Sequence, residues 1–414
     1  RLLELAADDH VLLVTMHHSV TDGWSMTVFF RELVALYEAY EAGRPSPLQP
    51  LKVQYADFAH WQRQWLSGDV LAVQQAYWRE QLAGIEPVLA LPTDRPRPAI
   101  KTYAGAVQRV HFSKALQGQL HQLSQAQGVT LYITLLAGFK VLLSRYSNQT
   151  DIAVGSPIAN RPRAELEGLI GFFVNTLVMR TEVSGSLTFV ELLQRVKQAA
   201  LGAYAHQDVP FEQLVELLQP ERSLSYTPFF QVMFTLQNLP SFAVNALEMR
   251  ISPIEQESRA AKFDLTVSLF ESTDGLRGEV EYNADLFDAG SIERLMGHYE
   301  QLLSAVVAAP TQKISRYELL SGAERQQLLV GWNATACEYP QDKCLHELFA
   351  QQVERTPSAV AVTYNNEHLT YAQLDSKANQ LAHYLIKRGV QSDVIVGIAI
   401  ERSLEMLIGL LGIL

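Results

Sequence analysis

The sequence predicts a mixed α/β protein made of more than one domain. Its 414 residues are enough for two or three domains, each with its own hydrophobic core. Short apolar runs typical of buried strands alternate with amphipathic helical patterns along most of the chain. A mixed, turn-rich stretch at residues 311–344 interrupts this alternation, which then begins again. These observations predict a larger first part and a smaller second part.

The first strand is expected at residues 10–18, where the apolar run HVLLVTMHH lies between polar residues. The turn TDG follows it, and residues 25–40 then place their apolar side chains on one helical face. Ser25 is a suitable N-cap for this helix. Polar side chains at a strand end and in the following turn are common in active sites, so this segment is the first candidate for chemistry.

Two adjacent histidines end the predicted strand, and they could form a metal site, an acid–base pair or part of the packing. Neighbouring strand residues point to opposite faces, so His17 and His18 are expected to have different surroundings. This favours one functional imidazole over a metal site, which needs several converging ligands. An imidazole has an ordinary pKa of about 6.5, which suits acid–base work. Asp22 could fix the loop by pairing with a charge or could only cap the helix, and Gly23 could allow close backbone approach.

Alternation continues through the rest of the first part. Helices are predicted at residues 55–66, 71–83, 113–127, 130–146, 188–205 and 289–308, and one more begins near Pro210. Strands are predicted in DIAVGSPIANRPR, VNTLVMRTEV and FFQVMFTLQN, and a hairpin in KFDLTVSLFESTDGLRGEVEYN turns at Asp274-Gly275. The Gly155–Pro157 sequence is expected to be a turn, not a nucleophile elbow.

The second part repeats the pattern over fewer elements. The predicted order is a helix in LHELFAQQVE, a strand in AVAVTYNN, a turn at Asn365-Asn366, a helix in YAQLDSKANQLAHYLIKRG, a strand in VIVGIAI and a helix that starts at Ser403.

Composition excludes several functions. The net charge of -11 and the lack of a basic run argue against nucleic acid as a partner. Two cysteines in 414 residues form no disulfide framework and suit a reducing, cytoplasmic location. No signal peptide and no membrane-spanning run is visible. The chain begins without methionine and ends in the apolar run MLIGLLGIL, so a piece of a larger protein is expected.

Common nucleotide and hydrolase motifs are absent as well. The sequence has no GxxxxGK phosphate loop, no GxGxxG after a strand, no GxSxG elbow and no HExxH. It therefore predicts neither a serine hydrolase nor an enzyme driven by a nucleotide bound to these residues.

The segment HHSVTDG, from His17 to Gly23, matches the HHxxxDG signature of condensation domains of nonribosomal peptide synthetases. Further matches follow in the order typical of that family: YADFAHWQRQWL, IGFFVNTLVMR, AHQDVPFEQLV and ERSLSYTPFFQVMF. After the linker, LTYAQLDSKANQLAHYLIKRGV resembles the opening of an adenylation domain. The chain is identified by this resemblance, over essentially its whole length, as a condensation domain followed by the start of an AMP-binding domain.

The resemblance implies a two-lobed α/β fold similar to chloramphenicol acetyltransferase, with a tunnel between the lobes. Residues 1–310 would be the condensation domain, with 1–150 as the end of a truncated first lobe and 151–310 as the second lobe. Residues 311–344 would be the linker, and 345–414 the truncated α/β start of the adenylation domain. With parts of both domains outside it, this fragment is expected to be inactive alone or to act only within the larger protein.

The implied reaction is peptide-bond formation. The α-amine of an acceptor thioester would attack the carbonyl of a donor thioester, both carried on 4'-phosphopantetheine arms by upstream and downstream peptidyl carrier domains. The resemblance implies no metal and no bound cofactor for this step. ATP would bind only in the rest of the adenylation domain, which is expected in cis, and neither nucleic acid nor membrane is an expected partner.

By the same resemblance, His18 would be catalytic, either as the base for the amine or as a group that positions it. His17 and Asp22, the other polar members of the catalytic motif, would be structural, with Asp22 in a salt bridge, and Gly23 would form the tight turn beside the channel.

Three residues outside the core of the motif would shape the site. Arg161 is the candidate partner for Asp22, and Asn175 would act across the lobe interface. Trp24 is expected to pack against the site without taking part in the chemistry.

Four other functions are weighed against condensation. An epimerisation domain shares HHxxxDG, but the QDVPFE and FFVNT stretches and the adenylation start favour condensation. The adenylation start also argues against a stand-alone acyltransferase that uses a CoA thioester. A non-catalytic docking scaffold is disfavoured by the intact motif. A heterocyclising domain would have aspartates where His17 and His18 stand. The sequences of the family motifs favour a donor residue of L configuration.

Overall fold

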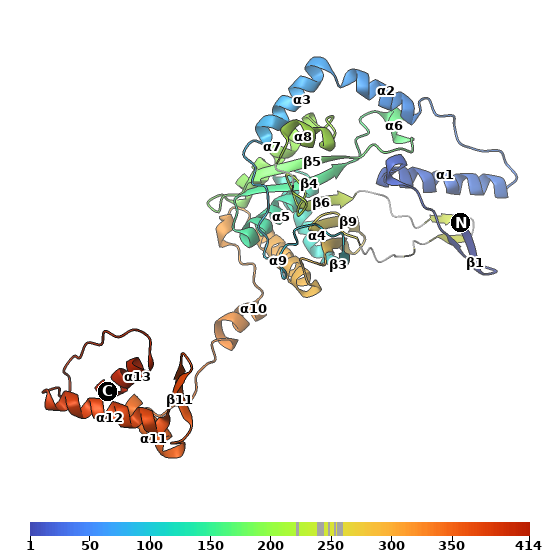
Figure 1. Cartoon of the computed structure of the whole chain (residues 1–414). Coiled ribbons are helices and arrows are strands. Elements are labelled where there is room, and N and C mark those ends of the chain that lie inside the picture. Colours follow the sequence, from blue (N-terminus) through green and yellow to red (C-terminus); the bar gives the residue numbers. More distant parts are fainter. Residues whose placement is uncertain (221–222, 238–243, 247–248, 252–253, 255–259) are drawn as a thin grey trace. The chain divides into compact units, whose positions relative to one another are not determined.

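The computed structural model describes residues 1–220, 223–237, 244–246, 249–251, 254 and 260–414 (Figure 1). The chain divides into two compact units, residues 1–325 and residues 326–414, and each is described by itself. Two residues of the ERSLSYTPFFQVMF stretch, 221–222, and the last residue of the predicted FFQVMFTLQN strand lie outside the described residues.

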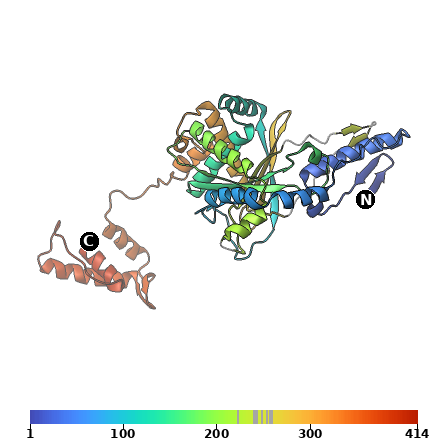
Figure 2. The same ribbon diagram turned by 90° about the horizontal axis from the view of Figure 1, so that it is seen from above.

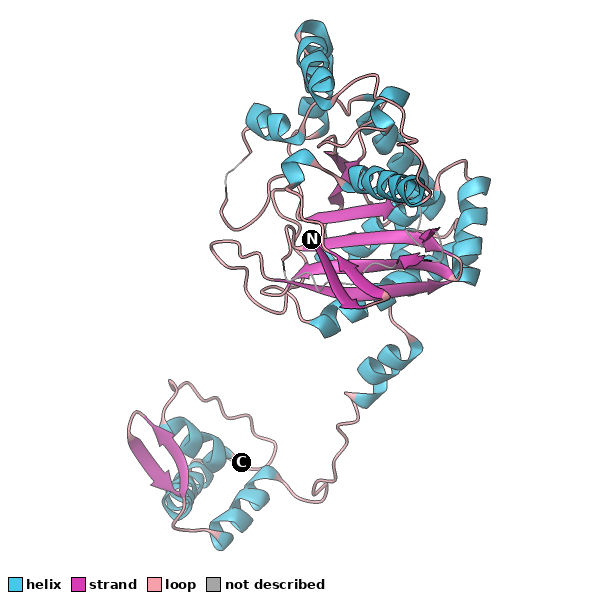
Figure 3. Ribbon diagram, turned by 90° about the vertical axis from the view of Figure 1, so that its right-hand side faces the viewer, coloured by secondary structure: helices cyan, strands magenta, loops and turns pink. Residues whose placement is uncertain are grey.

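The first unit contains a six-stranded mixed sheet with the order β3-β10-β9-β6-β4-β5 (Figure 3). Strand β6 runs parallel to β4 and β9, and the other neighbours are antiparallel. The strands are β3 (Gly105–Ser113), β4 (Asp151–Ile158), β5 (Asn175–Glu182), β6 (Val232–Gln237), β9 (Leu265–Ser272) and β10 (Gly275–Asn283). The β9–β10 hairpin turns at the predicted place, where Gly275 has a positive φ of 141°.

Helices pack on this sheet and on one another. They are α2 (Tyr55–Trp65), α3 (Gly68–Gln81), α4 (Lys114–Ala126), α5 (Leu131–Ser147), α6 (Ala164–Glu167), α7 (Phe189–Ala205), α8 (Phe211–Leu218) and α9 (Ala289–Ala308). Helix α5 contacts α4, α7 and α9, and α8 contacts α3 and β5. Pro210 is the N-cap of α8, close to its predicted place in the first turn.

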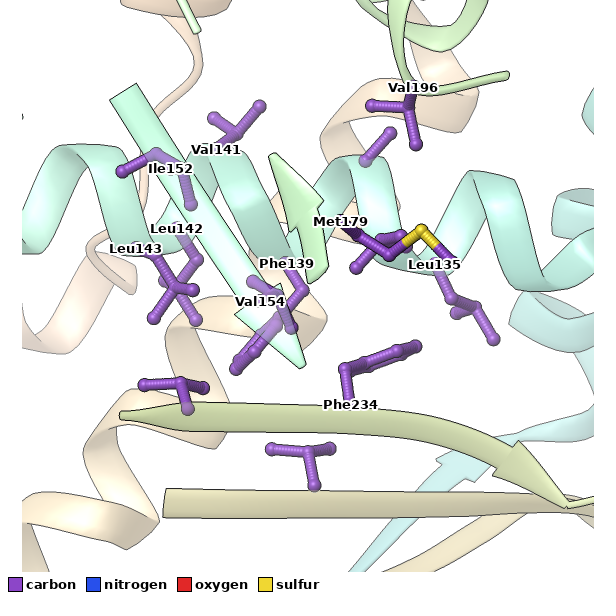
Figure 4. Packing of buried hydrophobic residues seen from close by; sticks show 14 of the residues in the cluster. Leu135, Phe139, Val141, Leu142, Leu143, Ile152, Val154, Met179, Val196 and Phe234 are labelled. Atoms are coloured by element: carbon purple, nitrogen blue, oxygen red, sulfur yellow. The ribbon is translucent and has the colours of Figure 1, made fainter. Parts of the chain in front are cut away.

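The hydrophobic core centres on α5, which is apolar on nearly every side and buried without a break from Ile133 to Leu143. Figure 4 shows Phe139 of this helix beside Phe234 of β6, and their ring centroids are 5.2 Å apart. Among the described residues no single helix is long and apolar enough to cross a membrane. The bent pair of α4 and α5 passes that test by length and composition only.

The sheet corrects the expected lobe boundary at residue 150. Strand β3 pairs with β10 along its whole length, from Gly105 to Ser113, so the sheet of the second lobe already includes residues before 150. The expected linker at 311–344 also starts too early, because Ile314 and Tyr317 are buried in the core of the first unit. Local patterns did not reveal these boundaries because both depend on long-range packing.

The predicted strand at residues 10–18 is shorter than expected. A hairpin of β1 (Leu2–Ala6) and β2 (Asp9–Leu12) forms instead, and Leu12 pairs with Leu2 where β1 begins. Because a strand continues only where a partner satisfies its backbone, the histidines lie beyond the strand. The hairpin is largely exposed, and Figure 2 shows it beside α1 (Gly23–Glu41), both extending from the body of the unit. The prediction of a turn at Gly155–Pro157 is also wrong, because these residues lie within β4.

The second unit differs from its predicted order in two places: β12 was not predicted, and the strand expected at 394–400 is absent from the described structure. It contains α11 (Leu345–Arg355), β11 (Val360–Tyr364), β12 (Glu367–Thr370), α12 (Tyr371–Lys387) and α13 (Leu404–Ile413), and the chain reaches it through α10 (Gly322–Gln326) and the π-helical turn η3 (Gln327–Gly331). Asn365 and Asn366 both have positive φ, as a tight hairpin turn requires. Residues 394–400 form no strand, because no described strand of this unit pairs with them.

Candidate active site at the histidine turn

The histidines lie in a short segment that we call the histidine turn, residues 17–21. It contains the 3-10 helix η1 (His18–Val20), for which His17 is the N-cap. The Nδ1 atom of His17 accepts a hydrogen bond of 3.1 Å from the backbone N–H of Ser19. The Nδ1 atom of His18 lies 2.7 Å from the carbonyl oxygen of Thr21. Both histidines are exposed. Each ring is held by a hydrogen bond to a backbone group of its own turn.

These two hydrogen bonds give the neighbouring rings opposite tautomers. A carbonyl oxygen only accepts, so Nδ1 of His18 must donate a hydrogen to Thr21 and Nε2 then holds the lone pair of the neutral ring. For His17 the backbone N–H donates to Nδ1, so the hydrogen of the neutral ring is on Nε2. Nε2 of His18 has no hydrogen-bond partner in the described part of the chain. Of the two rings, His18 is therefore the one that presents a basic nitrogen outward.

Behind the turn lies a buried group of three side chains, Asp22, Ser25 and Arg161, which we call the ion-pair cluster. Oδ1 of Asp22 accepts hydrogen bonds from the backbone N–H of Ser25 at 2.8 Å and from its hydroxyl at 2.7 Å. Nη2 of Arg161 lies 3.3 Å from the same Oδ1 and 2.9 Å from Oγ of Ser25. Asp22 is 4% exposed, so this ion pair is shielded from water.

Arg161 joins the cluster to the loop before β5. Its Nη1 donates to the carbonyl oxygens of Leu166 and Leu169 at 2.5 and 2.8 Å, and its guanidinium lies 3.9 Å from the centre of the Phe173 ring. Oδ2 of Asp22 accepts a 3.0 Å hydrogen bond from the backbone N–H of Phe173. Two segments that lie far apart in the sequence are thus attached to each other directly behind the histidine turn.

The electrostatics of the cluster favour a charged aspartate. Burial by itself would raise the pKa of Asp22, but the hydrogen bonds from Ser25 and Phe173 and the charge of Arg161 hold that pKa below its usual value. Burial lowers the pKa of Arg161, an effect that the nearby Asp22 opposes. A guanidinium remains protonated at neutral pH in such a site.

The predicted pairing of Asp22 with Arg161 is confirmed. Asp22 also caps α1, so both interpretations of this residue hold together, and the expected N-cap Ser25 lies inside the helix. Apart from its chain neighbours and the backbone of its own helix, no atom of the described residues lies within 4 Å of the position that a Cβ on Gly23 would take, and its φ is not positive. The expected close backbone approach at Gly23 is therefore wrong.

The other two predicted site-shaping residues make specific contacts. Nε1 of Trp24 donates a 2.8 Å hydrogen bond to the carbonyl oxygen of Glu167, and its packing role at the site remains a prediction. Asn175 begins β5, where its amide donates to the carbonyls of Gln207 and Val209 and accepts from the backbone N–H of Phe211. Asn175 therefore fixes the segment that leads into α8, and its action on the site remains a prediction.

Sequence reasoning did not predict two residues of the site that are far from the histidines in sequence. The ring of Phe172 meets the His18 ring edge-on, with centroids 5.2 Å apart and planes at 87°. The hydroxyl of Tyr55 donates a 2.8 Å hydrogen bond to the carbonyl oxygen of Phe172. Both residues lie in stretches that resemble family motifs, but no spacing rule connects either of them to the histidines.

Elsewhere the described structure contains two cavities but no metal-binding cluster. No group of three or more His, Cys, Asp or Glu side chains is placed to hold a metal ion among these residues. Two cavities of about 520 and 530 Å³ are lined by other segments, one between α3, β5 and α7 and one beside α9 and residues 315–320. The histidine turn is thus the candidate active site.

The fold is that of two-lobed condensation domains, which resemble chloramphenicol acetyltransferase. The chain belongs to the condensation domain family, whose model matches residues 1–329, and a model of AMP-binding enzymes matches residues 349–414. Condensation domains are acyltransferases that form amide bonds in nonribosomal peptide synthetases.

Large synthetases are among the relatives. The chain is 51% identical over 415 residues to one component of the linear gramicidin synthase of Brevibacillus parabrevis, with all of this chain and 8% of that protein covered. It is 46% identical over 413 residues to malpinin synthetase of Mortierella alpina, again with all of this chain and 5% of that protein covered. The chain therefore spans less than a tenth of the length of these relatives.

Solved structures agree with this assignment. The X-domain from teicoplanin biosynthesis is 33% identical, with a TM-score of 0.71 and coverage of 77% of this chain and 74% of that one. A four-domain nonribosomal peptide synthetase bound to AMP and glycine has a TM-score of 0.77, covering 91% of this chain and 29% of that one. Its identity of 23% shows the fold alone.

Proposed function

We propose that this chain forms peptide bonds during nonribosomal peptide synthesis. The α-amine of an acceptor aminoacyl thioester attacks the carbonyl carbon of a donor thioester, and both reactants are held on phosphopantetheine arms of carrier domains. A C–N bond forms, the C–S bond breaks, and the donor arm leaves as a thiol that receives the proton lost by the amine. The single observation that supports this most is the free Nε2 of His18 on a turn fixed by a buried ion pair.

His18 has two possible roles in this step. Its Nε2 can take the proton from the attacking amine and return it to the departing sulfur, which would contribute about 10²- to 10⁴-fold. It can instead hold the amine by a hydrogen bond, because orientation of two tethered reactants is itself effective. In both roles the tautomer set by Thr21 is required, since only an unprotonated Nε2 can accept from the amine.

The other motif residues support His18 without contacting substrate. Asp22 and Arg161 attach the histidine turn to the loop before β5, and His17 closes the turn from its other side. No metal or bound cofactor is required for this chemistry. The partners in the proposal are the upstream and downstream carrier domains and the remainder of the adenylation domain in cis, where ATP would bind.

The experiment uses the intact parent synthetase module. A donor carrier and an acceptor carrier are loaded with their aminoacyl groups, and carrier-bound dipeptide is followed by intact-protein mass spectrometry. Wild type is compared with His18→Ala and with Ile170→Ala, a substitution of an exposed side chain on a nearby loop. Dipeptide from wild type and from Ile170→Ala, with a strong loss for His18→Ala, would support the proposal. Equal product from all three would contradict the role of His18, and no dipeptide from wild type would contradict the proposed function.

A second candidate is a docking scaffold without chemistry. The observation that favours it is the 33% identity to the teicoplanin X-domain, a domain also solved in complex with OxyB. The same experiment separates the two functions, because a scaffold would give no dipeptide from the loaded wild-type module. An epimerisation domain would also give none, but the chirality of the carrier-bound residue would change.

A further inference from the structure

We infer that Phe172 is a positioning residue for His18, an inference that rests on the proposed function. Its ring stands edge-on against the imidazole, at 5.2 Å between centroids and 87° between planes. This is the T-shaped arrangement that aromatic pairs prefer. Phe172 is 37% exposed, so it is an apolar side chain on the surface beside the candidate catalytic ring.

The single hydrogen bond of His18 leaves its ring free to rotate, so a second contact is needed to fix the direction of Nε2. The bond from Nδ1 to the carbonyl of Thr21 sets the tautomer and one point of the ring. A ring held at one point on an exposed turn can still swing about that point, and its χ2 torsion is intrinsically broad. An aromatic edge against the ring limits that motion. With both contacts in place, Nε2 points in one direction, which is what a reaction between two tethered partners requires.

The loop that holds Phe172 is itself fixed by backbone contacts. Oγ of Ser25 accepts from the N–H of Gly171 at 3.1 Å and lies 2.9 Å from its carbonyl oxygen. The hydroxyl of Tyr55 donates to the carbonyl of Phe172 at 2.8 Å, and the N–H of Phe173 donates to Asp22 at 3.0 Å. Three consecutive residues are therefore bonded through their backbones to side chains of α1, α2 and the α1 N-cap.

Side chains on the same loop add to this rigidity. A Cβ on Gly171 would stand 2.3 Å from Cδ2 of Tyr55, so only glycine permits this approach. The Phe173 ring is 2% exposed and packs against Phe58 at 4.7 Å and against Tyr55 at 5.0 Å between ring centroids. Because the loop and the histidine turn are fixed to the same ion-pair cluster, the contact between Phe172 and His18 is built into the site.

The test is a double-mutant cycle in the intact module, with single-turnover formation of carrier-bound dipeptide as the measured rate. Phe172→Leu keeps apolar volume but removes the aromatic edge, and Phe172→Tyr keeps the ring. Each is made with His18 present and in a His18→Asn background, whose slow residual reaction is followed over hours. Ile170→Ala is the matched control, because Ile170 is also 37% exposed on the same loop and has no ring.

The expected result is a fall of about 3- to 10-fold in the rate at saturating carrier for Phe172→Leu, near-wild-type rates for Phe172→Tyr and Ile170→Ala, and no further fall for Phe172→Leu when His18 is absent. The apparent affinity for the acceptor carrier should not change. Equal falls in both backgrounds, or no fall in either, would overturn the positioning role while the proposed function stands. No dipeptide from wild type would overturn the proposed function, and this inference with it.

Discussion

The two halves of the segment from His17 to Ser25 differ in almost every physical respect. The first half, residues 17–20, is exposed, and in the described part of the chain its histidines hydrogen-bond only to groups within three residues of themselves. In the second half Asp22 and Ser25 are buried, and their side chains reach backbone and side-chain groups about 140 to 150 residues further along the chain. The comparison teaches that one short motif separates chemistry from attachment. In the proposed function the exposed half offers the Nε2 of His18 to substrate, and the buried side chains of the second half fix the position of the turn.

The exposed half should control rate without controlling stability. We expect His18→Ala to lower the single-turnover rate of dipeptide formation by about 10²- to 10⁴-fold, because it removes the group that accepts from the amine. The unfolding transition should move little, because the ring is exposed and its hydrogen bond is local. Rapid-quench mass spectrometry and thermal unfolding of the same protein measure both. A large loss of stability would show that the two halves are not separate.

The buried half should control stability. We expect Asp22→Ala to lower the free energy of unfolding by about 3–5 kcal/mol, because it leaves the Arg161 charge buried without its partner. Glu182→Ala is the matched control, since Glu182 and Arg195 form a pair at 3.2 Å whose side chains are 69% and 45% exposed. That substitution should cost less than about 1 kcal/mol. Chemical denaturation followed by tryptophan fluorescence compares them, and equal losses would contradict the argument from burial.

Lys140 is a second buried basic residue and differs from Arg161 in its partners. In the described structure it hydrogen-bonds to neutral oxygens and not to a carboxylate. Its Nζ donates to the carbonyls of Ile152 and Met179 and to the hydroxyl of Thr181. Burial lowers the pKa of Lys140 to about 7, against the weaker effect of Asp151. Above pH 7 the folded state has released this proton, while an unfolded lysine keeps it up to about pH 10.4. The unfolded state then binds more protons, so the free energy of unfolding should rise with pH in this window.

The expected rise is about 2 kcal/mol between pH 7 and pH 9 relative to Lys140→Met, which lacks the titrating group. Denaturation curves at several pH values, taken for both proteins, measure the difference between their slopes. Parallel pH dependence in the two proteins would show that Lys140 stays charged in the core.

The smallest effect should come from His17, the other exposed ring. Its Nδ1 accepts from one backbone N–H in a turn that water reaches, so His17→Ala should cost less than about 1 kcal/mol of stability. The rate of dipeptide formation should stay within about 3-fold of wild type, because the ring presents no basic nitrogen outward. A loss as large as that of His18→Ala would place His17 in the chemistry.

Much of the fold could be predicted from local patterns. Helices such as α5 and α7 appear within two residues of their predicted ends, because their apolar periodicity and caps are local. Strand β3 was not predicted, since its role depends on pairing with β10 more than 160 residues later. The strand expected at 394–400 failed for the same reason: an apolar run forms a strand only where a partner exists.

The site shows the same limit. The HHxxxDG segment identified His18 and Asp22, and the family resemblance suggested Arg161 as a partner for Asp22. The prediction that the histidines lie at the end of a strand was wrong. The strand ends before them, and they lie in a 3-10 turn whose hydrogen bonds determine their tautomers. Phe172 was invisible to sequence reasoning, since a single aromatic residue on a loop has no spacing that connects it with an imidazole.

The distance along the chain between Ser25 and Gly171 also has a consequence during synthesis of the protein on the ribosome. These residues bond to each other across 146 positions. A ribosome adds about 5–20 residues per second, so the histidine turn waits roughly 7 to 30 seconds before its attachment site has been synthesised. During that interval His18 is present but has no fixed direction. The contacts that attach the histidine turn to the rest of the domain therefore form only after translation has passed the loop before β5.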